Sequence, residues 1–205
     1  SMGGVSGAFL LLPFQVSVLN FTSPAVSPTN LVYNIVAIPS GVKVFNWVAS
    51  FYKGSIEVRP PLLFTLAFIF LFSIGGLTGL FQGALSTNLH VHGTYFIVAH
   101  FHYVMFGGTA MGFFAGLHYW YPKMFGRLYE EHLAKLAWVV LFLGFNMLYF
   151  PMFVLGWEGM PRRYYDYLPR FNTLNLISTI GSWVLALGLV MMFYNLVRSL
   201  FRGER

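Results

Sequence analysis

The chain contains no cysteine, and only 9% of its 205 residues are charged. Without cysteine it can build no disulfide framework, no thiolate metal site and no cysteine-ligated iron–sulfur cluster. Soluble domains carry roughly 25% charged residues, so this chain has too few to cover a surface that faces water. The two absences together exclude a disulfide-stabilised scaffold and an ordinary soluble fold.

The chain is instead rich in apolar side chains: 57% of its residues are hydrophobic and 20% are aromatic. They come in blocks of about 20 residues, which is the length a helix needs to cross ~30 Å of hydrocarbon. We predict an all-α integral membrane protein that forms a single transmembrane domain over residues 1–205. Its six expected helices cover residues 4–19, 30–52, 61–85, 93–121, 133–155 and 171–198.

The charged residues lie mainly in the connectors between these blocks. On an alternating topology, one side of the membrane receives Lys53, Arg59, Lys123, Arg127, Lys135, Arg198, Arg202 and Arg205, and the other receives Arg162, Arg163 and Arg170. By the positive-inside rule the first side is cytoplasmic, so both termini are expected to face the cytoplasm. The net charge of +6 thus follows from membrane topology, and no nucleic acid partner is expected.

Four of the six histidines lie within 13 residues, between His90 and His102. His100 and His102 fall inside the fourth block, where an ionisable side chain is costly and marks a functional site. Two residues along a helix correspond to a rotation of about 200°, so the two rings point to opposite faces and cannot share one metal. Imidazole is a common ligand of haem iron, which favours two haems, one on each side of the helix. The alternative is that each histidine hydrogen-bonds a neighbouring helix.

The histidine run resembles the tenth transmembrane segment of subunit I of the haem-copper respiratory oxidases. That family's pattern is His-Asp-Thr-Tyr-Tyr/Phe-Val-Val-Ala-His-Phe-His-Tyr-Val, and this chain reads His92-Gly-Thr-Tyr-Phe-Ile-Val-Ala-His100-Phe-His102-Tyr-Val. The match continues in the family's order at residues 38–47, 75–79, 144–147 and 159–164 and covers residues 30–198. The chain therefore resembles the C-terminal half, segments seven to twelve, and its helices are expected to form half of a subunit I bundle.

The resemblance implies a haem-binding subunit of a cytochrome c oxidase-type complex in a bacterial or archaeal cytoplasmic membrane. Such a complex is an oxidoreductase of aerobic respiration, which passes electrons to oxygen and translocates protons. The implied partners are membrane lipid, other oxidase subunits, a chain that supplies the missing N-terminal helices, and cytochrome c or quinol as electron donor. The subunit is not expected to be competent alone.

Residue roles follow from the same resemblance. It implies that His100 is the axial ligand of the high-spin haem iron and His102 that of the low-spin haem iron. Arg162 and Arg163, in the outer loop before the last block, are implied to bind haem propionates, and a guanidinium suits carboxylate recognition.

Lys43 lies in the middle of the second block, where a lysine without a partner costs about 2.5 to 3.5 kcal/mol. Such a position marks a proton or ion path. Family members use a threonine and a lysine one helical turn apart to take up protons, and Ser40 with Lys43 keeps this spacing. The alternative is that Lys43 snorkels to an interface.

The copper ligands of the family are absent from this chain. In the family, the segment before residue 30 ends in an adjacent His-His pair, and the corresponding positions here fall at Val18-Leu19 or Leu19-Asn20. The sequence contains no adjacent histidines, and aliphatic side chains cannot ligate copper. Copper is expected only if another chain supplies it.

At the outer surface, the family's His-Asp becomes His92-Gly93, which removes a hard oxygen ligand. We assign no magnesium or manganese there and keep His92 as a possible outer metal ligand. His90 and His132 are expected in exposed loops, and His118 in an aromatic belt at the membrane surface.

Three interpretations remain open. The chain is the C-terminal part of a split oxidase, a copper-less haem-binding paralogue or structural subunit that reduces no oxygen itself, or a relative of the nitric oxide reductases. In the last group iron replaces copper but is also held by histidines, so residues 18–20 argue against it equally, and Lys43 favours the oxygen-reducing branch.

Overall fold

The structure is a computed structural model that describes residues 41–203. The chain divides into two units, Ser1–Ile56 and Glu57–Arg205. In the described part of the first unit, residues 41–51 form a helix, which falls within the block expected at 30–52. The helix expected at 4–19 and the first part of the next one lie outside the described residues.

The second unit is a set of long helices. Their order along the chain is α3 (Pro60–Gly83), α4 (Leu85–Val91), α5 (Tyr95–Val104), the π-helix η2 (Met105–Ala110), α6 (Met111–Phe125), α7 (Glu131–Trp157), the short 3-10 helix η3 (Pro169–Phe171) and α8 (Asn172–Arg202). Helix α5, η2 and α6 follow one another without a break as a single rod, Tyr95–Phe125.

Four rods in the described residues are long and apolar enough to cross a membrane: Pro60–Gly83, Tyr95–Phe125, Glu131–Trp157 and Pro169–Arg202. They lie at the last four of the six expected positions, and no strand occurs between residues 41 and 203. The prediction of an all-α membrane protein is confirmed. The count of spans in this part of the chain is four rather than six, because residues 4–19 and 30–40 fall outside it.

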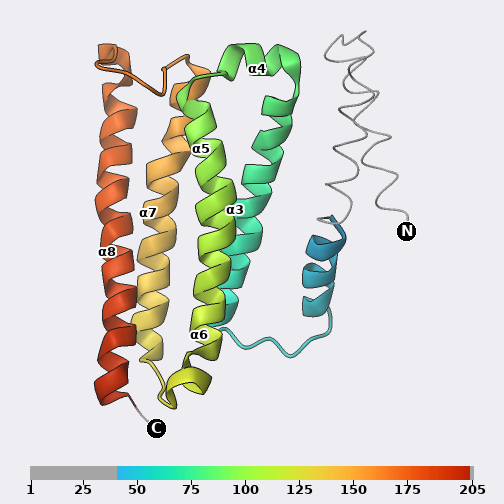
Figure 1. Cartoon of the computed structure of the whole chain (residues 1–205), viewed down its shortest axis with the longest axis vertical. Helices are drawn as coiled ribbons and strands as arrows, with labels where there is room; N and C mark the ends of the chain where they lie inside the picture. Colours follow the sequence, from blue (N-terminus) through green and yellow to red (C-terminus); the bar gives the residue numbers. More distant parts are fainter. Residues whose placement is uncertain (1–40, 204–205) are drawn as a thin grey trace. The chain divides into compact units, whose positions relative to one another are not determined.

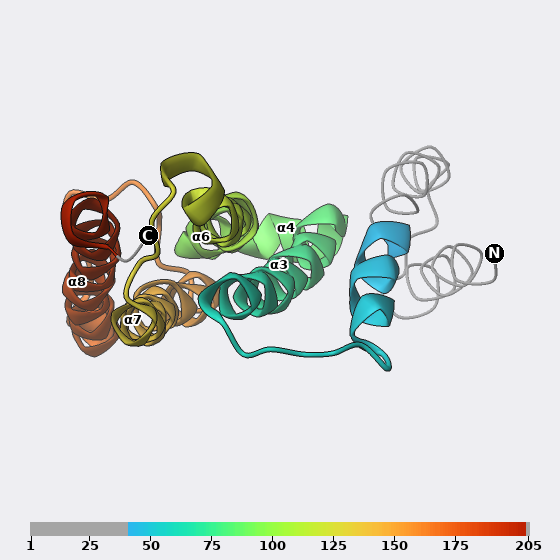
Figure 2. The same cartoon turned by 90° about the horizontal axis from the view of Figure 1, so that it is seen from below.

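The four rods of this unit stand side by side and alternate in direction (Figure 1). Helix α4 and the connector after α7 lie at one end, and the connector between α6 and α7 lies at the other. Seen along the rods, α3 and α6 are neighbours, and α7 stands beside α8 (Figure 2). The connectors that the sequence predicts on the outer side therefore lie at one end of the unit, the end with α4 and residues 158–171.

The ends of the rods follow from local sequence. Helix α3 begins with two prolines at its first positions, where no intrahelical N–H is required. Helix α6 ends at Gly126, whose φ of 65° lies in the left-handed region that glycine adopts without strain. Because α3 and α6 run in opposite directions, the start of α3 and the end of α6 lie at the same end of the unit (Figure 1).

Glycine allows α7 and α8 to approach each other closely. A Cβ atom at Gly188 would lie 2.6 Å from the backbone nitrogen of Leu141, and Cβ atoms at Gly144 and Gly181 would overlap the facing backbone in the same way. Without water to drive association in a bilayer, helices gain from van der Waals contact at small residues. The α7–α8 pair is therefore built on these three positions.

A hydrogen-bonded pair of side chains joins α5 to α7 inside the core. The hydroxyl of Tyr103, which is fully buried, donates to Oδ1 of Asn146 at 2.9 Å. The amide of Asn146 donates in turn to the carbonyl of Phe142 at 2.8 Å. A buried hydroxyl in an apolar core needs such a partner, so this bond fixes the register of the two helices beside His102.

Candidate haem-ligand site

The start of α5 is hydrogen-bonded to the connector between α7 and η3. Gly93, with φ of 74°, turns the chain, and its carbonyl accepts from the backbone N–H of Arg162 at 3.0 Å. The N–H of Tyr95 donates to the carbonyl of Met160, also at 3.0 Å. Residues 93–95, at the start of α5, are thus bonded to residues 160–162. The loop that carries Arg162 and Arg163 therefore lies at the start of α5.

His100 is half-buried and faces α3. Its Nδ1–H donates to the carbonyl of Gly75 at 2.9 Å and lies 3.2 Å from Oγ1 of Thr78. The Thr78 hydroxyl donates to the same carbonyl at 2.9 Å, which leaves its oxygen to accept from the imidazole. Because a carbonyl can only accept, the proton sits on Nδ1 and Nε2 keeps its lone pair.

His102 is also half-buried and faces α7. Its Nδ1–H donates to the carbonyl of Val98, one turn earlier in its own helix, at 2.8 Å. Its ring stacks on that of Tyr149 with centroids 4.1 Å apart and an angle of 18° between the planes. Here too the proton lies on Nδ1, and Nε2 is the nitrogen with a free lone pair.

The two histidines therefore contact different neighbouring helices, α3 and α7. The bond from His100 to α3 is the helix–helix contact that a purely structural histidine would make, whereas the bond of His102 stays within α5. In both rings only Nδ1 is hydrogen-bonded, so Nε2 stays available to ligate a metal. A carbonyl that accepts from the second ring nitrogen is the usual partner of a metal-bound imidazole, because it orients the ring and raises its basicity.

Two glycines of α3 make room for the His100 side of α5. A Cβ atom at Gly75 would lie 2.9 Å from the backbone nitrogen of Val104, and one at Gly79 would lie 3.0 Å from Cε1 of His100. These are the first and last glycines of the run at residues 75–79. The two glycines allow α3 and α5 to approach each other closely. This approach brings the Gly75 carbonyl within hydrogen-bonding distance of the His100 imidazole.

The rod widens just after the histidines. Residues Met105–Ala110 form the π-helix η2, in which Gly107 and Gly108 are buried. A Cβ atom at Gly107 would lie 2.7 Å from Cβ of Leu71 on α3. A continuous α-helix was expected over 93–121; the structure instead inserts a wide turn, a feature that occurs frequently next to functional sites.

The described part of the chain contains no group of three or more histidine, cysteine, aspartate or glutamate side chains that could share a metal ion. One imidazole for each haem iron needs no such group, and the two free Nε2 atoms fit that requirement. His92 is exposed and belongs to no such group among the described residues, so its role as an outer metal ligand stays a prediction.

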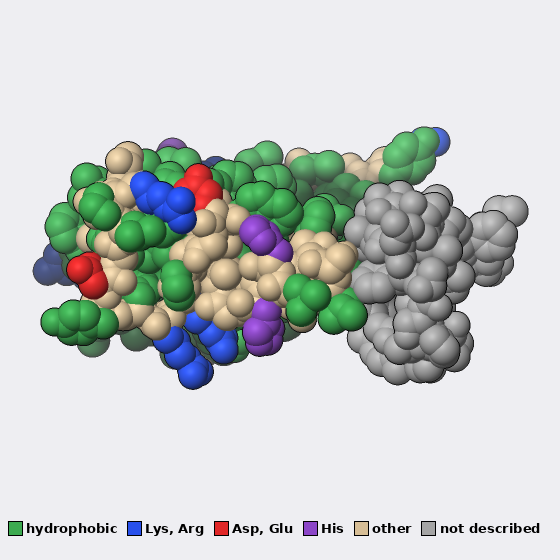
Figure 3. Space-filling view, turned by 90° about the horizontal axis from the view of Figure 1, so that it is seen from above, with side chains coloured by type: hydrophobic (Ala, Val, Ile, Leu, Met, Phe, Trp, Pro, Cys, Tyr) green, Lys and Arg blue, Asp and Glu red, His purple; other side chains and the backbone are tan. Residues whose placement is uncertain are grey.

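The end of the second unit that carries α4 presents histidine and basic side chains (Figure 3). Arg162 is half-buried and Arg163 is exposed. Within residues 41–203 neither guanidinium has a hydrogen bond or ion pair, so both can receive an anionic group. Neighbouring hydroxyls of Tyr95 and Tyr164 lie 2.9 Å apart at the same end.

Three other histidines depart from expectation. His90 is exposed but lies in α4 rather than a loop, and its Nε2–H donates to the carbonyl of Trp157 at 2.9 Å. His132 lies in the first turn of α7, because that helix begins at Glu131. His118 is 1% exposed and stacks on Phe64, so it belongs to the core rather than to an aromatic belt.

The predicted proton-path residues, Ser40 and Lys43, both belong to the first unit of the chain. Lys43 is exposed in the helix at 41–51, with its Nζ 5.6 Å from the ring centroid of Trp47. Ser40 lies outside the described residues, as do residues 18–20, so the Ser40–Lys43 pairing and the lost copper ligands stay predictions from the sequence.

Two partners of the histidines could not be foreseen from the histidine pattern. Thr78 was part of a matched run, but nothing in the sequence singled out its hydroxyl as the neighbour of His100. Tyr149 lies in an aromatic-rich helix where no spacing rule connects it to His102. Contacts between helices depend on how the rods are rotated against each other, which a periodic pattern leaves open.

Known proteins share the sequence pattern of this chain. The family described as cytochrome c and quinol oxidase polypeptide I matches residues 27–184. The cytochrome c oxidase subunit 1 of Thermostichus vulcanus is 45% identical over 170 residues, which cover 83% of this chain and 31% of that protein. The quinol oxidase subunit 1 of Bacillus subtilis strain 168 is 45% identical over 166 residues, which cover 80% of this chain and 26% of that protein.

A solved structure of a heme-copper terminal oxidase dimer matches with a TM-score of 0.66 and 24% sequence identity, over 98% of this chain and 36% of that one. At this identity the likeness shows the fold. The chain spans about a third or less of the length of the relatives it matches. Since the family's pattern covers most of its residues, the chain belongs to the cytochrome c and quinol oxidase polypeptide I family.

Proposed function

We propose that this chain is the haem-binding C-terminal part of subunit I of a terminal respiratory oxidase, which passes electrons to oxygen and translocates protons across a bacterial membrane. The observation that supports this most is the state of the two imidazoles of α5. Each has Nδ1 occupied by a backbone carbonyl and Nε2 free, on sides of the helix that face different neighbours.

His100 would hold the high-spin haem iron and His102 the low-spin haem iron. When bound, the haems supply the one-electron redox chemistry and the oxygen-binding position. The Gly75 and Val98 carbonyls keep the proton on Nδ1, so the ring presents Nε2 to the iron in a fixed direction. Tyr149 holds the His102 ring by stacking.

Arg162 and Arg163 would bind the haem propionates at the outer end. A guanidinium offers paired N–H donors to a carboxylate and keeps its charge at any physiological pH. Both side chains lack a partner among the described residues, and the loop that carries them is bonded to the first residues of α5. The loop and the ligand helix would thus form one haem-binding unit.

Ser40 and Lys43 would conduct protons towards the high-spin haem. A lysine ammonium that can release and regain its proton suits this role when a hydroxyl lies one turn away. The proposal rests on the spacing of the two residues and on the family to which the chain belongs.

An oxidase of this family needs further elements besides these helices. The family's N-terminal helices would supply the second low-spin haem ligand and the copper site, and cytochrome c or quinol would donate electrons. A copper-less haem paralogue is the second candidate, and the observation that favours it is the absence of any adjacent histidine pair in the sequence.

Metal analysis and electron paramagnetic resonance of the purified complex distinguish the two candidates. An oxidase contains copper close to the haem content and a high-spin haem that binds carbon monoxide. A copper-to-haem ratio near zero, with no haem that binds carbon monoxide, would reject the oxidase and leave the paralogue.

A further inference from the structure

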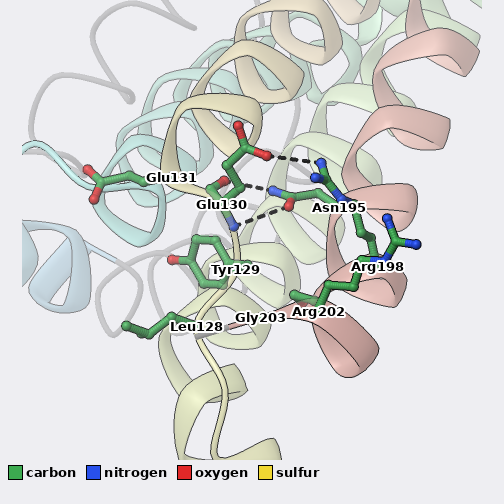
Figure 4. Close-up of a pocket in the computed structure, with 9 residues that line it drawn as sticks. Leu128, Tyr129, Glu130, Glu131, Asn195, Arg198, Arg202 and Gly203 are labelled. Carbon is green, nitrogen blue, oxygen red and sulfur yellow. Dashed lines mark hydrogen bonds and ion pairs between the residues drawn. The ribbon is translucent and has the colours of Figure 1, made fainter. Parts of the chain in front are cut away.

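A cavity of about 410 Å³ lies where the α6–α7 connector meets the end of α8 (Figure 4). This is the end of the bundle opposite to the loop that carries Arg162 and Arg163. One wall consists of residues 128–131. The other is formed by the last two turns of α8 and the residue after it: Asn195, Arg198, Ser199, Arg202 and Gly203.

The connector is bonded to α8, so the cavity is preformed. The side-chain amide of Asn195, which is 2% exposed, donates to the carbonyl of Glu130 at 2.8 Å, and the Glu130 N–H donates back to Oδ1 of Asn195 at 3.2 Å (Figure 4). Arg127 donates from Nη1 to the carbonyls of Phe201 and Gly203 at 3.3 and 3.2 Å. These bonds hold both walls in place without a ligand.

One guanidinium in the cavity lining has no carboxylate partner in the described part of the chain. The Glu130 carboxylate pairs with Arg198 at 3.2 Å, and the Glu131 carboxylate pairs with Lys135 at 2.7 Å. Arg202, the other arginine of the lining, has no carboxylate partner among the described residues. Both acids are therefore already neutralised, and the guanidinium of Arg202 remains to attract an anion, for which arginine is well suited.

The length of α8 places the cavity at the level of the lipid headgroups. Its 31 residues span about 46 Å at 1.5 Å per residue, whereas the hydrocarbon is ~30 Å thick. Arg198 and Arg202 occupy the last two turns, so they lie beyond the hydrocarbon, where arginine side chains are stable.

An apolar stripe on α8 leads to the cavity. Val190, Tyr194, Val197 and Phe201 are each more than half exposed. Their spacing of three or four residues puts them on one face of the helix, next to Arg198 and Arg202. A free phosphate ion would make no use of this stripe, whereas the acyl chain of a lipid would cover it.

We propose that the cavity binds an anionic phospholipid, with the phosphate group beside Arg202 and one acyl chain along Val190, Tyr194 and Val197. Basic pockets between membrane helices are typical sites for such headgroups. The proposal needs only that the chain spans a membrane, and it does not depend on haem binding or on oxidase activity.

Native mass spectrometry of the chain, purified in detergent with the subunits that accompany it, tests the proposal. After delipidation, the protein is titrated with phosphatidylglycerol and, separately, with phosphatidylcholine of the same acyl chains. We expect one phosphatidylglycerol to bind at least fivefold more tightly than phosphatidylcholine, and Arg202→Gln to weaken its binding about fivefold.

The matched control is Lys123→Gln, which removes one positive charge at the same end of the bundle but outside the cavity; it should leave binding unchanged. Val197→Ser should weaken binding of the long-chain lipid without changing the helix content. Equal affinity for the two lipids, equal losses in Arg202→Gln and Lys123→Gln, or full displacement by inorganic phosphate would each overturn the proposal.

Discussion

The ring of His102 lies parallel to that of Tyr149, with centroids 4.1 Å apart. The two residues are on α5 and α7, and the contact leaves Nε2 of the imidazole free. Because the Nδ1 bond of His102 stays within its own helix, Tyr149 is the neighbour that fixes the ring from outside. The low-spin haem proposed here would therefore depend on α7 as well as on α5.

Tyr149→Leu is expected to weaken retention of the low-spin haem. A stacked ring pair contributes about 1 kcal/mol beyond its buried area, so haem affinity should fall about fivefold. Tyr149→Phe keeps the stack and serves as the control. Haem content and the reduced spectrum of the purified complex measure both; identical losses in Leu and Phe would assign the effect to the hydroxyl instead.

Gly75→Ala is expected to disturb the high-spin site. Its Cβ would lie 2.9 Å from the backbone of Val104, so α3 and α5 must separate, at a cost of about 1–3 kcal/mol. Carbon monoxide binding and thermal stability should both decrease. Gly76→Ala, where a Cβ meets nothing within 4 Å, should change neither, and an equal decrease there would contradict the close-approach argument.

Lys43→Met is expected to slow reduction of the high-spin haem while both haems are retained. Methionine has nearly the same length but carries no proton, so only proton delivery changes. Stopped-flow reduction of the purified complex measures the rate, with Lys53→Met as the control for a lost charge near the same helix. An unchanged rate would reject the proton-path role.

Tyr129, in the α6–α7 connector, makes the stability of the chain depend on pH. Burial, reinforced by the negative charge of Glu131, raises the pKa of Tyr129 to about 12. The unfolded chain releases this proton near pH 10, so stability from the neutral hydroxyl is present below about pH 10 and is lost as the pH rises to about 12.

Thermal unfolding in detergent between these two pH values should therefore show a smaller decrease for Tyr129→Phe than for the unchanged protein. Phenylalanine keeps the ring but has no proton to release. The same decrease in both proteins would mean that other groups determine the alkaline loss of stability.

Much of the fold could be predicted because the thickness of a bilayer restricts the length of a helix that spans it. The four described rods lie where the hydrophobic blocks are, since a span of fixed thickness demands a fixed helix length. The placing of His100 and His102 against different helices also follows from the 100° turn per residue. Both features depend only on the local periodicity of the helix.

The parts that could not be predicted depend on contacts between rods. In the π-helix at Met105–Ala110, Gly107 packs closely against Leu71 on α3, and the buried His118 stacks on Phe64. The hydrogen bonds at Nδ1 of His100 need the α3 backbone at one particular rotation. A sequence pattern specifies a face of a helix but not the partner that this face meets.

Reduced-minus-oxidised spectra of three variants of the purified complex test whether His100 and His102 each ligate a haem. His102→Ala should lose the low-spin haem signal and keep the carbon monoxide-binding haem, and His100→Ala should do the reverse. His118→Phe, which removes a buried imidazole from the same rod, should change neither signal. Unchanged haem spectra in His100→Ala and His102→Ala would contradict the assignment of α5 as the helix that ligates both haems.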